Sequence, residues 1–197
     1  MSLGAILLAG GRATRVDGAV KPLFEVGGTT LLERALTAAR GAGAERITVV
    51  GPVLAEIPDV TWVREDPPHG GPAAAVVAAL ASWPDAAPEW TLVLACDLPR
   101  AGDAAALLRE SAALTPSGVD GLCLADETGR PQWLTALYRT APLRRAASRL
   151  PDGGRDAPVR ALVDDLAIAV VADRDGRSRD VDTWEDLRRA REEGAPR

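Results

Sequence analysis

The sequence predicts an α/β fold, a single domain of three α/β/α layers built around a mostly parallel central sheet. A strand, a helix and a strand follow one another early in the chain, and this alternation is typical of parallel α/β proteins. The composition agrees, because 47% of the residues are hydrophobic and only 4% are aromatic, so the core must be mainly aliphatic. A chain of 197 residues can bury such a core within one domain.

In the first half of the chain, the expected helices begin and end at recognisable signals. Thr30 and Glu33 have the spacing of a capping box, and Gly41 and Gly43 are good stop residues, so one helix is expected between them. Pro72 suits the first turn of a second, alanine-rich helix. Apolar or β-branched runs predict strands at residues 5–9, 23–26, 46–50, 60–63 and 90–95.

The second half of the chain continues the same alternation. Residues 103–114 have an amphipathic pattern that predicts a helix, and residues 140–166 read as helices interrupted by a Pro-Asp-Gly-Gly turn. Thr183 and Asp186 have the N-cap spacing of a final helix. Further strands are expected at residues 119–124, 132–138 and 167–171. We expect one domain over residues 1–191 and a disordered tail at residues 192–197.

Charge and composition exclude several classes of partner. The net charge is −5, so neither nucleic acid nor an anionic membrane is expected to bind, and no apolar run approaches the length of a membrane span. Cys96 and Cys123 form neither a disulfide framework nor a metal-binding spacing. The N-terminal residues lack the pattern of a secretory signal, and a cytoplasmic location is therefore expected.

The strand at residues 5–9 leads into a glycine-containing loop that carries positive charge. Gly10 and Gly11 let the backbone approach a ligand closely, and successive N–H groups in such a turn can form a concave anion site. Arg12, Arg15 and Lys21 follow in the same loop, so the segment predicts a cradle for a triphosphate. It is not a Walker loop, because a proline follows the lysine, and it lacks the dinucleotide fingerprint.

Lys21 is the only lysine in the chain, and all the other cations among the 23 basic residues are arginines. A lysine is a compact point charge on a flexible stem and suits a phosphate differently from the planar guanidinium group. It is either a chance survivor in a surface loop or a phosphate-binding residue. Its position in the glycine-containing loop favours phosphate binding.

Carboxylates follow the expected strands at two places. Asp97 comes directly after residues 90–95, at the end of a strand where open α/β sheets bind ligands, and Mg²⁺ prefers one or two carboxylates together with phosphate oxygens. An N-cap role for Asp97 is less favoured, because Gly102 and Asp103 are nearer to the expected helix. Asp180 and Asp182 lie two residues apart and would share one face of an extended segment, either as solvated turn residues or with Asp182 as a second metal contact.

These motifs resemble those of a known family. Residues 8–21 resemble the signature Leu-Ala-Gly-Gly-x(3)-Arg-x(5)-Lys of nucleotidyltransferases with a sugar-nucleotide-transferase-like fold. Residues 96–99 resemble their Cys-Asp-x-Pro metal motif, and residues 71–75 resemble their Gly-Pro-x-Ala-Gly segment, with Ala75 replacing the last glycine. Within this group, the sequence is similar to the molybdenum cofactor guanylyltransferases over essentially the whole chain.

The resemblance implies a Rossmann-like nucleotidyltransferase fold, a Mg²⁺ cofactor and the transfer of GMP from GTP to molybdopterin with release of pyrophosphate. It implies that Arg15, Lys21 and Asp97 are catalytic, and that Asp97 and Asp182 hold the metal. The nucleotide-binding residues that it implies are Leu8, Ala9, Gly10, Gly11, Lys21, Asp66, Gly71 and Asp97.

Some positions depart from the family pattern and keep alternatives open. Val16, Asp17 and Val20 replace the usual Met, Gly and Asp, and Trp133 replaces a usual Pro beside the expected acceptor pocket. Arg130 binds the acceptor phosphate or is an exposed turn residue. The acceptor is then molybdopterin, or a phospho-sugar or phospholactate-type acid, or the chain is a non-catalytic nucleotide-binding module. Lys21 and Asp97 together favour an enzyme.

Overall fold

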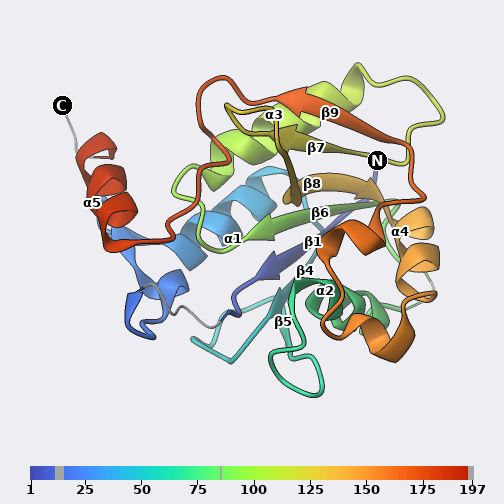
Figure 1. Ribbon diagram of the computed structural model, residues 1–197, viewed down its shortest axis with the longest axis horizontal. Coiled ribbons are helices and arrows are strands. Elements are labelled where there is room, and N and C mark those ends of the chain that lie inside the picture. Colours follow the sequence, from blue (N-terminus) through green and yellow to red (C-terminus); the bar gives the residue numbers. More distant parts are fainter. Residues whose placement is uncertain (12–15, 85, 195–197) are drawn as a thin grey trace.

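The computed structural model describes residues 1–11, 16–84 and 86–194, and these residues form a seven-stranded sheet with helices on both faces (Figure 1). The strand order is β5-β4-β1-β6-β8-β7-β9. Neighbouring strands are parallel except at β8, which runs antiparallel to β6 and to β7. The predicted α/β fold with a mostly parallel central sheet is confirmed.

The main sheet and a small hairpin account for the strands of the described residues. The strands of the main sheet are β1 Leu3–Leu8, β4 Arg46–Val50, β5 Val60–Val63, β6 Trp90–Ala95, β7 Gly121–Ala125, β8 Pro131–Arg139 and β9 Ile168–Ala172. The hairpin pairs β2 Glu25–Val26 with β3 Thr29–Thr30. The helices are α1 Leu31–Gly41, α2 Pro72–Ala81, α3 Ala101–Ala113, α4 Thr140–Ala147 and α5 Trp184–Glu193, with short 3₁₀ segments η2 Lys21–Leu23, η3 Pro151–Gly154 and η4 Val159–Leu162.

The two faces of the sheet have separate aliphatic cores. Helices α1 and α3 pack together on one face, where Leu36 and Leu108 are buried against the strands. Helices α2 and α4 and the segment η4 cover the other face, with Leu80 and Leu143 in that core. A third, smaller cluster joins α5 to the β2–β3 hairpin. The helices cover the faces of the sheet, so the loops that carry the predicted site residues lie at the carboxyl ends of the parallel strands.

The local signals read from the sequence are largely confirmed. Thr30 and Glu33 form a capping box at α1, and Thr183 and Asp186 form one at α5. Helix α3 starts earlier than predicted, with Arg100 as its N-cap. The predicted strand at residues 23–26 is shorter, because the chain makes a 3₁₀ turn at residues 21–23, where a proline suits the first turn.

The C-terminal helix extends beyond the expected domain boundary. Glu192 and Glu193, which were expected in the tail, are the last residues of α5, and residues 195–197 lie outside the described part of the chain. Within the described ranges, the helices are all too short or too polar to cross a membrane.

Candidate active site

The candidate site lies where the strand order reverses direction. From β1 the chain proceeds to β4 and β5 on one side of the sheet and then returns to β6 on the other side. The loops that follow β1 and β6 carry the Gly10–Gly11 pair and Asp97, so the two motifs read from the sequence meet at one end of the sheet. Ligands of open α/β sheets bind in the crevice at such a switch point.

Close backbone packing holds the loop after β1. The Ala9 N–H donates to the Val50 carbonyl oxygen at 2.9 Å, and the Cys96 N–H donates to the Leu8 carbonyl oxygen at 2.9 Å. At Gly51, φ is +150°, and a Cβ atom would lie 3.0 Å from the carbonyl carbon of Ala9. A side chain at Gly51 would therefore push the glycine-containing loop away, a requirement that the sequence alone did not reveal.

Two adjoining cavities gather most of the predicted nucleotide-binding residues. One, of about 380 Å³, is lined by Leu8, Gly10, Gly11, Gly71 and Asp97 among others. The second, of about 330 Å³, is lined by Ala9, Lys21 and Asp97, and it also contains both glycines of the loop. Gly71, where φ is +92°, is the N-cap of α2, and the first turn of this helix contributes Gly71, Pro72 and Ala75 to the wall of the first cavity.

Two of the predicted site residues, Asp66 and Arg15, are not found among the described residues that line these cavities. Asp66 is exposed and is not among the lining residues of these cavities, whereas its neighbour Glu65 lines both. Glu65 also accepts a hydrogen bond from the His69 N–H at 3.0 Å, which holds the turn before α2. Arg15 lies outside the described residues, as does Arg12.

Three carboxylates form the centre of the site. Asp97, Asp180 and Asp182 each place one oxygen within 4.8 Å of the others. The Val181 N–H donates to the Asp97 carbonyl oxygen at 2.9 Å, and the Val181 side chain is buried in the small core under α5. Because Val181 faces the core, its two acidic neighbours are directed toward Asp97. The sequence favoured Asp182 as a second metal contact and left open whether Asp180 takes that place, and the structure brings both residues close to Asp97.

Burial and charge repulsion make this cluster a strong candidate for a cation site. The Oδ1 atom of Asp97 is buried and has no hydrogen-bond partner in the described structure. Burial, followed by the charge of Asp180, raises the pKa of Asp97 to about 7 against the opposing effect of Lys21. The pKa of Asp180 is also raised, by partial desolvation of its carboxylate and by the charge of Asp182, although Asp180 is exposed as a whole residue. Three hard oxygen donors with an unsatisfied buried oxygen fit a divalent cation.

Lys21 connects the glycine-containing loop after β1 to the carboxylate cluster. Its Nζ atom lies 2.5 Å from Oδ1 of Asp182, and its side chain is only 15% exposed. The 3₁₀ turn at residues 21–23 sets this position, and the Phe24 N–H donates to the Lys21 carbonyl oxygen at 2.9 Å. The only lysine of the chain is therefore held beside the predicted metal residues rather than in solvent.

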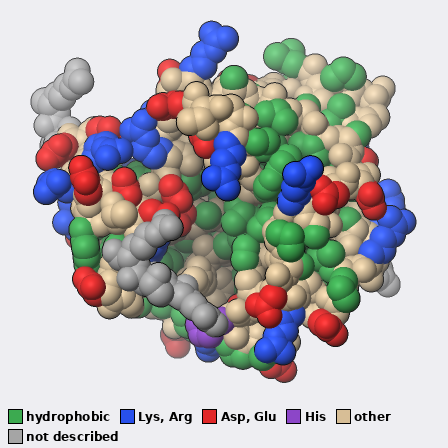
Figure 2. Space-filling model, viewed as in Figure 1, with side chains coloured by type: hydrophobic (Ala, Val, Ile, Leu, Met, Phe, Trp, Pro, Cys, Tyr) green, Lys and Arg blue, Asp and Glu red, His purple; other side chains and the backbone are tan. Residues whose placement is uncertain are grey.

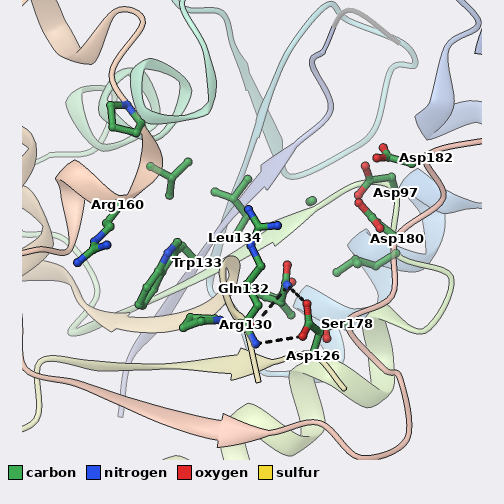
Figure 3. Close-up of a pocket in the computed structure, with 16 residues that line it drawn as sticks. Asp97, Asp126, Arg130, Gln132, Trp133, Leu134, Arg160, Ser178, Asp180 and Asp182 are labelled. Atoms are coloured by element: carbon green, nitrogen blue, oxygen red, sulfur yellow. Dashed lines mark hydrogen bonds between the residues drawn. The ribbon is translucent and has the colours of Figure 1, made fainter. Parts of the chain in front are cut away.

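A third and larger cavity, of about 970 Å³, also has Asp97 in its wall (Figure 3). Its walls come from β8, from η4 and from the segment before α5. It shares Ala95, Asp97 and Leu134 with the cavity of about 380 Å³. Figure 2 shows that this face of the molecule is hollowed near its centre, with acidic side chains beside the hollow.

The rim of this large cavity is ordered by Asp126. Its Oδ1 atom accepts hydrogen bonds from the Thr128 and Arg130 N–H groups at 2.9 Å and 3.0 Å, and its Oδ2 atom accepts one from Gln132 at 2.8 Å. Hydrogen bonds from Thr128 and Arg130 hold the pKa of Asp126 below its usual range. Arg130 lines the cavity, as the phosphate-binding alternative requires.

Comparison with known proteins identifies the family. The family model of the MobA-like NTP transferase domain matches residues 5–174. The chain belongs to the MobA-like NTP transferase family. It is therefore a nucleotidyltransferase, as the glycine-containing loop and the Cys-Asp-x-Pro motif indicated.

Individual relatives agree with this family in sequence and in fold. A probable molybdenum cofactor guanylyltransferase from Synechococcus elongatus is 33% identical over 168 residues, which cover 79% of this chain and 81% of that protein. Rv0371c from Mycobacterium tuberculosis H37Rv, solved in complex with manganese, is similar in fold, with a TM-score of 0.70 at 23% sequence identity. The superposed residues cover 98% of this chain and 99% of the Rv0371c chain. Molybdopterin-guanine dinucleotide biosynthesis protein A from Archaeoglobus fulgidus has a TM-score of 0.68 at 20% identity, with coverage of 96% and 97%.

Proposed function

We propose that this MobA-like protein transfers GMP from GTP to molybdopterin and releases pyrophosphate, with Mg²⁺ as its divalent cation. One observation carries the proposal: a glycine-lined cavity and a larger cavity meet at Ala95, Asp97 and Leu134. A nucleotide in the first cavity and a phosphorylated acceptor in the second would place their reacting groups together at Asp97. The names of the relatives support GTP and molybdopterin as the two substrates.

The chemistry needs few protein groups. An oxygen of the acceptor phosphate attacks the α-phosphorus of the nucleotide, the bond from that phosphorus to the bridging oxygen breaks, and pyrophosphate leaves. The acceptor phosphate is already ionised at neutral pH, so no protein base is required. The chain fits this requirement, because its only histidine, His69, is an exposed residue at the nucleotide side. Positioning and charge neutralisation then supply most of the catalysis.

Each part of the site has a role in this reaction. The backbone of Gly10 and Gly11 and the N-terminus of α2 would bind the nucleotide, and Lys21 would bring positive charge to the α-phosphate. Asp97, Asp180 and Asp182 would hold the divalent cation. When bound, that cation neutralises charge on the phosphate oxygens.

A thermal-shift panel tests the nucleotide and the metal together. GTP, CTP, ATP and UTP are each added with and without Mg²⁺, because a ligand that binds the native state raises the melting temperature. We expect a Mg²⁺-dependent increase with GTP that exceeds the increase with the other nucleotides. A shift with CTP alone would overturn the guanine assignment, and a GTP shift that is equal in EDTA would overturn the metal assignment.

Two substitutions test the assigned residues by pyrophosphate release from GTP and molybdopterin. Asp97→Ala and Lys21→Ala should each lower kcat/KM by at least about a hundredfold, the scale of a lost electrostatic contact to the transition state. Asp165→Ala and Arg188→Ala change exposed residues of the same charge and should leave the rate unchanged. Near-normal activity of either site variant would remove that residue from the mechanism.

A further inference from the structure

The large cavity has two ends of different chemical character (Figure 3). Asp97, Asp180 and Asp182 form one end, and Trp133 lies toward the other end near Arg160. The acidic end suits a phosphate only together with the cation and Lys21. The other end offers the aromatic surface of Trp133, and the guanidinium group of Arg160 at this end is paired with Asp164 at 2.8 Å. This end therefore suits a different part of the same acceptor molecule.

An irregularity in β8 places Trp133 in the cavity. Cys123 of β7 lies opposite Ala136, but the next residue, Leu124, lies opposite Gln132. Residues 133–135 therefore have no partner on β7, and the strand bulges beside the site. Bulges next to active sites change the direction of side chains, and here consecutive residues of β8 all line the cavity.

The indole of Trp133 packs against the core and also faces the large cavity. It is half-buried and packs against the core cluster beneath α2 and α4. The Tyr138 hydroxyl donates to the Trp133 carbonyl oxygen at 2.8 Å, which fixes the backbone of the bulge. The side chain also lines the open cavity, so a ligand can reach the aromatic surface without any rearrangement of the core.

From this geometry we propose that Trp133 is a specificity-determining residue that stacks against a planar heteroaromatic ring of the acceptor. The inference rests on the proposed function and adds to it a requirement on the acceptor: a flat ring at one end and a phosphate at the other. A ring gains stacking energy on an indole, whereas a phospho-sugar without an aromatic ring gains little. Trp133 thus favours an acceptor with a planar heteroaromatic ring over a phospho-sugar without one.

Equilibrium dialysis with pterin tests this platform directly, because pterin has the flat ring and no phosphate. Wild-type protein should bind pterin more tightly than ribose 5-phosphate, which has the phosphate and no aromatic ring. Trp133→Leu should weaken pterin binding by roughly tenfold or more, the scale of one lost stacking contact. Trp133→Phe keeps a ring and should restore most of the affinity.

The controls separate this inference from the proposed function. Trp62→Phe changes a half-buried tryptophan that lies on β5, outside the three site cavities, and should bind pterin as wild type does. Equal pterin affinity of wild type and Trp133→Leu, with the variant folded by its melting temperature, would overturn the inference. So would ribose 5-phosphate binding as tightly as pterin. A GTP-dependent rise in melting temperature without pterin binding would support nucleotidyl transfer and overturn the stacking role of Trp133. Pterin binding without pyrophosphate release would support the stacking role and overturn the proposed transfer.

Discussion

Asp97, Asp180 and Asp182 hold like charges so close together that they repel one another. Lys21 offsets part of this repulsion through its 2.5 Å contact with Asp182, but Oδ1 of Asp97 is buried and has no hydrogen-bond partner among the residues that the structure describes. A buried unpartnered carboxylate lowers the free energy of unfolding. At the scale of single residues, the centre is therefore arranged for a cation at the expense of the stability of the cation-free protein.

Asp97→Asn should show this conflict between stability and function. The substitution keeps the shape of the side chain and removes one of the repelling charges. In EDTA at pH 8, the melting temperature should rise by about 2–5 °C, because roughly 1 kcal/mol corresponds to 2–4 °C in a chain of this size. Mg²⁺ should stabilise the variant less than it stabilises wild type. Differential scanning calorimetry measures both effects, and a lower melting temperature in EDTA would contradict the argument.

The segment between β9 and α5 is the element that delivers the second and third carboxylates. Asp173 at its start is 1% exposed, and one of its oxygens accepts hydrogen bonds from the N–H and the hydroxyl of Ser178 at 2.6 Å and 2.8 Å. Ser178 itself lines the large cavity of about 970 Å³. These hydrogen bonds between Asp173 and Ser178, here called the clamp, close the loop before Asp180. The position of Asp180 and Asp182 relative to Asp97 therefore depends on the clamp.

The clamp gives a pH-dependent contribution to stability. Burial would raise the pKa of Asp173, but the hydrogen bonds from Ser178, together with those from the backbone of Arg177 and Asp175, outweigh burial and hold the pKa below its ordinary value of 3.8. A lowered pKa in the folded protein means that the stabilisation is complete above pH 4 and is lost as the pH falls through the folded pKa. Asp173→Asn should therefore cost about 1–3 kcal/mol at pH 7.

Urea denaturation of wild type and Asp173→Asn at pH 7 and at pH 3 measures this difference. The gap between the two proteins should be large at pH 7 and should shrink at pH 3. Asp165→Asn, which changes an exposed carboxylate, should show no comparable gap at pH 7. A gap that is the same at both pH values would show that the Asp173 charge does not contribute.

At the scale of the whole molecule, the layers pack through contacts that join distant parts of the chain. The indole N–H of Trp83, just after α2, donates to the Thr48 hydroxyl of β4 at 2.8 Å. The ring lies directly over Gly4 of β1, where a Cβ atom would be 2.5 Å from Cη2 of Trp83. The central strand thus needs a glycine at this position so that the helix layer can lie close to the sheet.

Gly4→Ala should destabilise the protein although alanine is otherwise compatible with a strand. The new methyl group would push a buried ring from its place, at a cost of about 1–3 kcal/mol. The melting temperature should fall by roughly 3–10 °C. Gly102→Ala is the matched control, because nothing lies within 4 Å of its Cβ position in α3, and it should be neutral or slightly stabilising. An unchanged melting temperature for Gly4→Ala would show that the ring can move at no cost.

The sequence by itself determined the local elements and the chemistry of the separate motifs. The runs at residues 46–50, 60–63 and 90–95 form strands with the predicted bounds, and both capping boxes are present. These features could be predicted because they depend on residues within a few positions of one another. The roles of the glycine-containing loop in phosphate binding and of Asp97 in metal binding were inferred from the residue types that a triphosphate and a divalent cation require, and they stay predictions.

Only the tertiary structure decided how these pieces meet. Lys21 contacts Asp182, and Asp180 places a carboxylate oxygen within 4.8 Å of one of Asp97. Both pairs join residues that are far apart in the chain, and no local pattern encodes such distances. The bulge that turns Trp133 into the cavity is likewise a property of pairing between strands, not of β8 alone. Local sequence sets which conformations the chain favours, but packing of the layers around one sheet sets which side chains share a cavity.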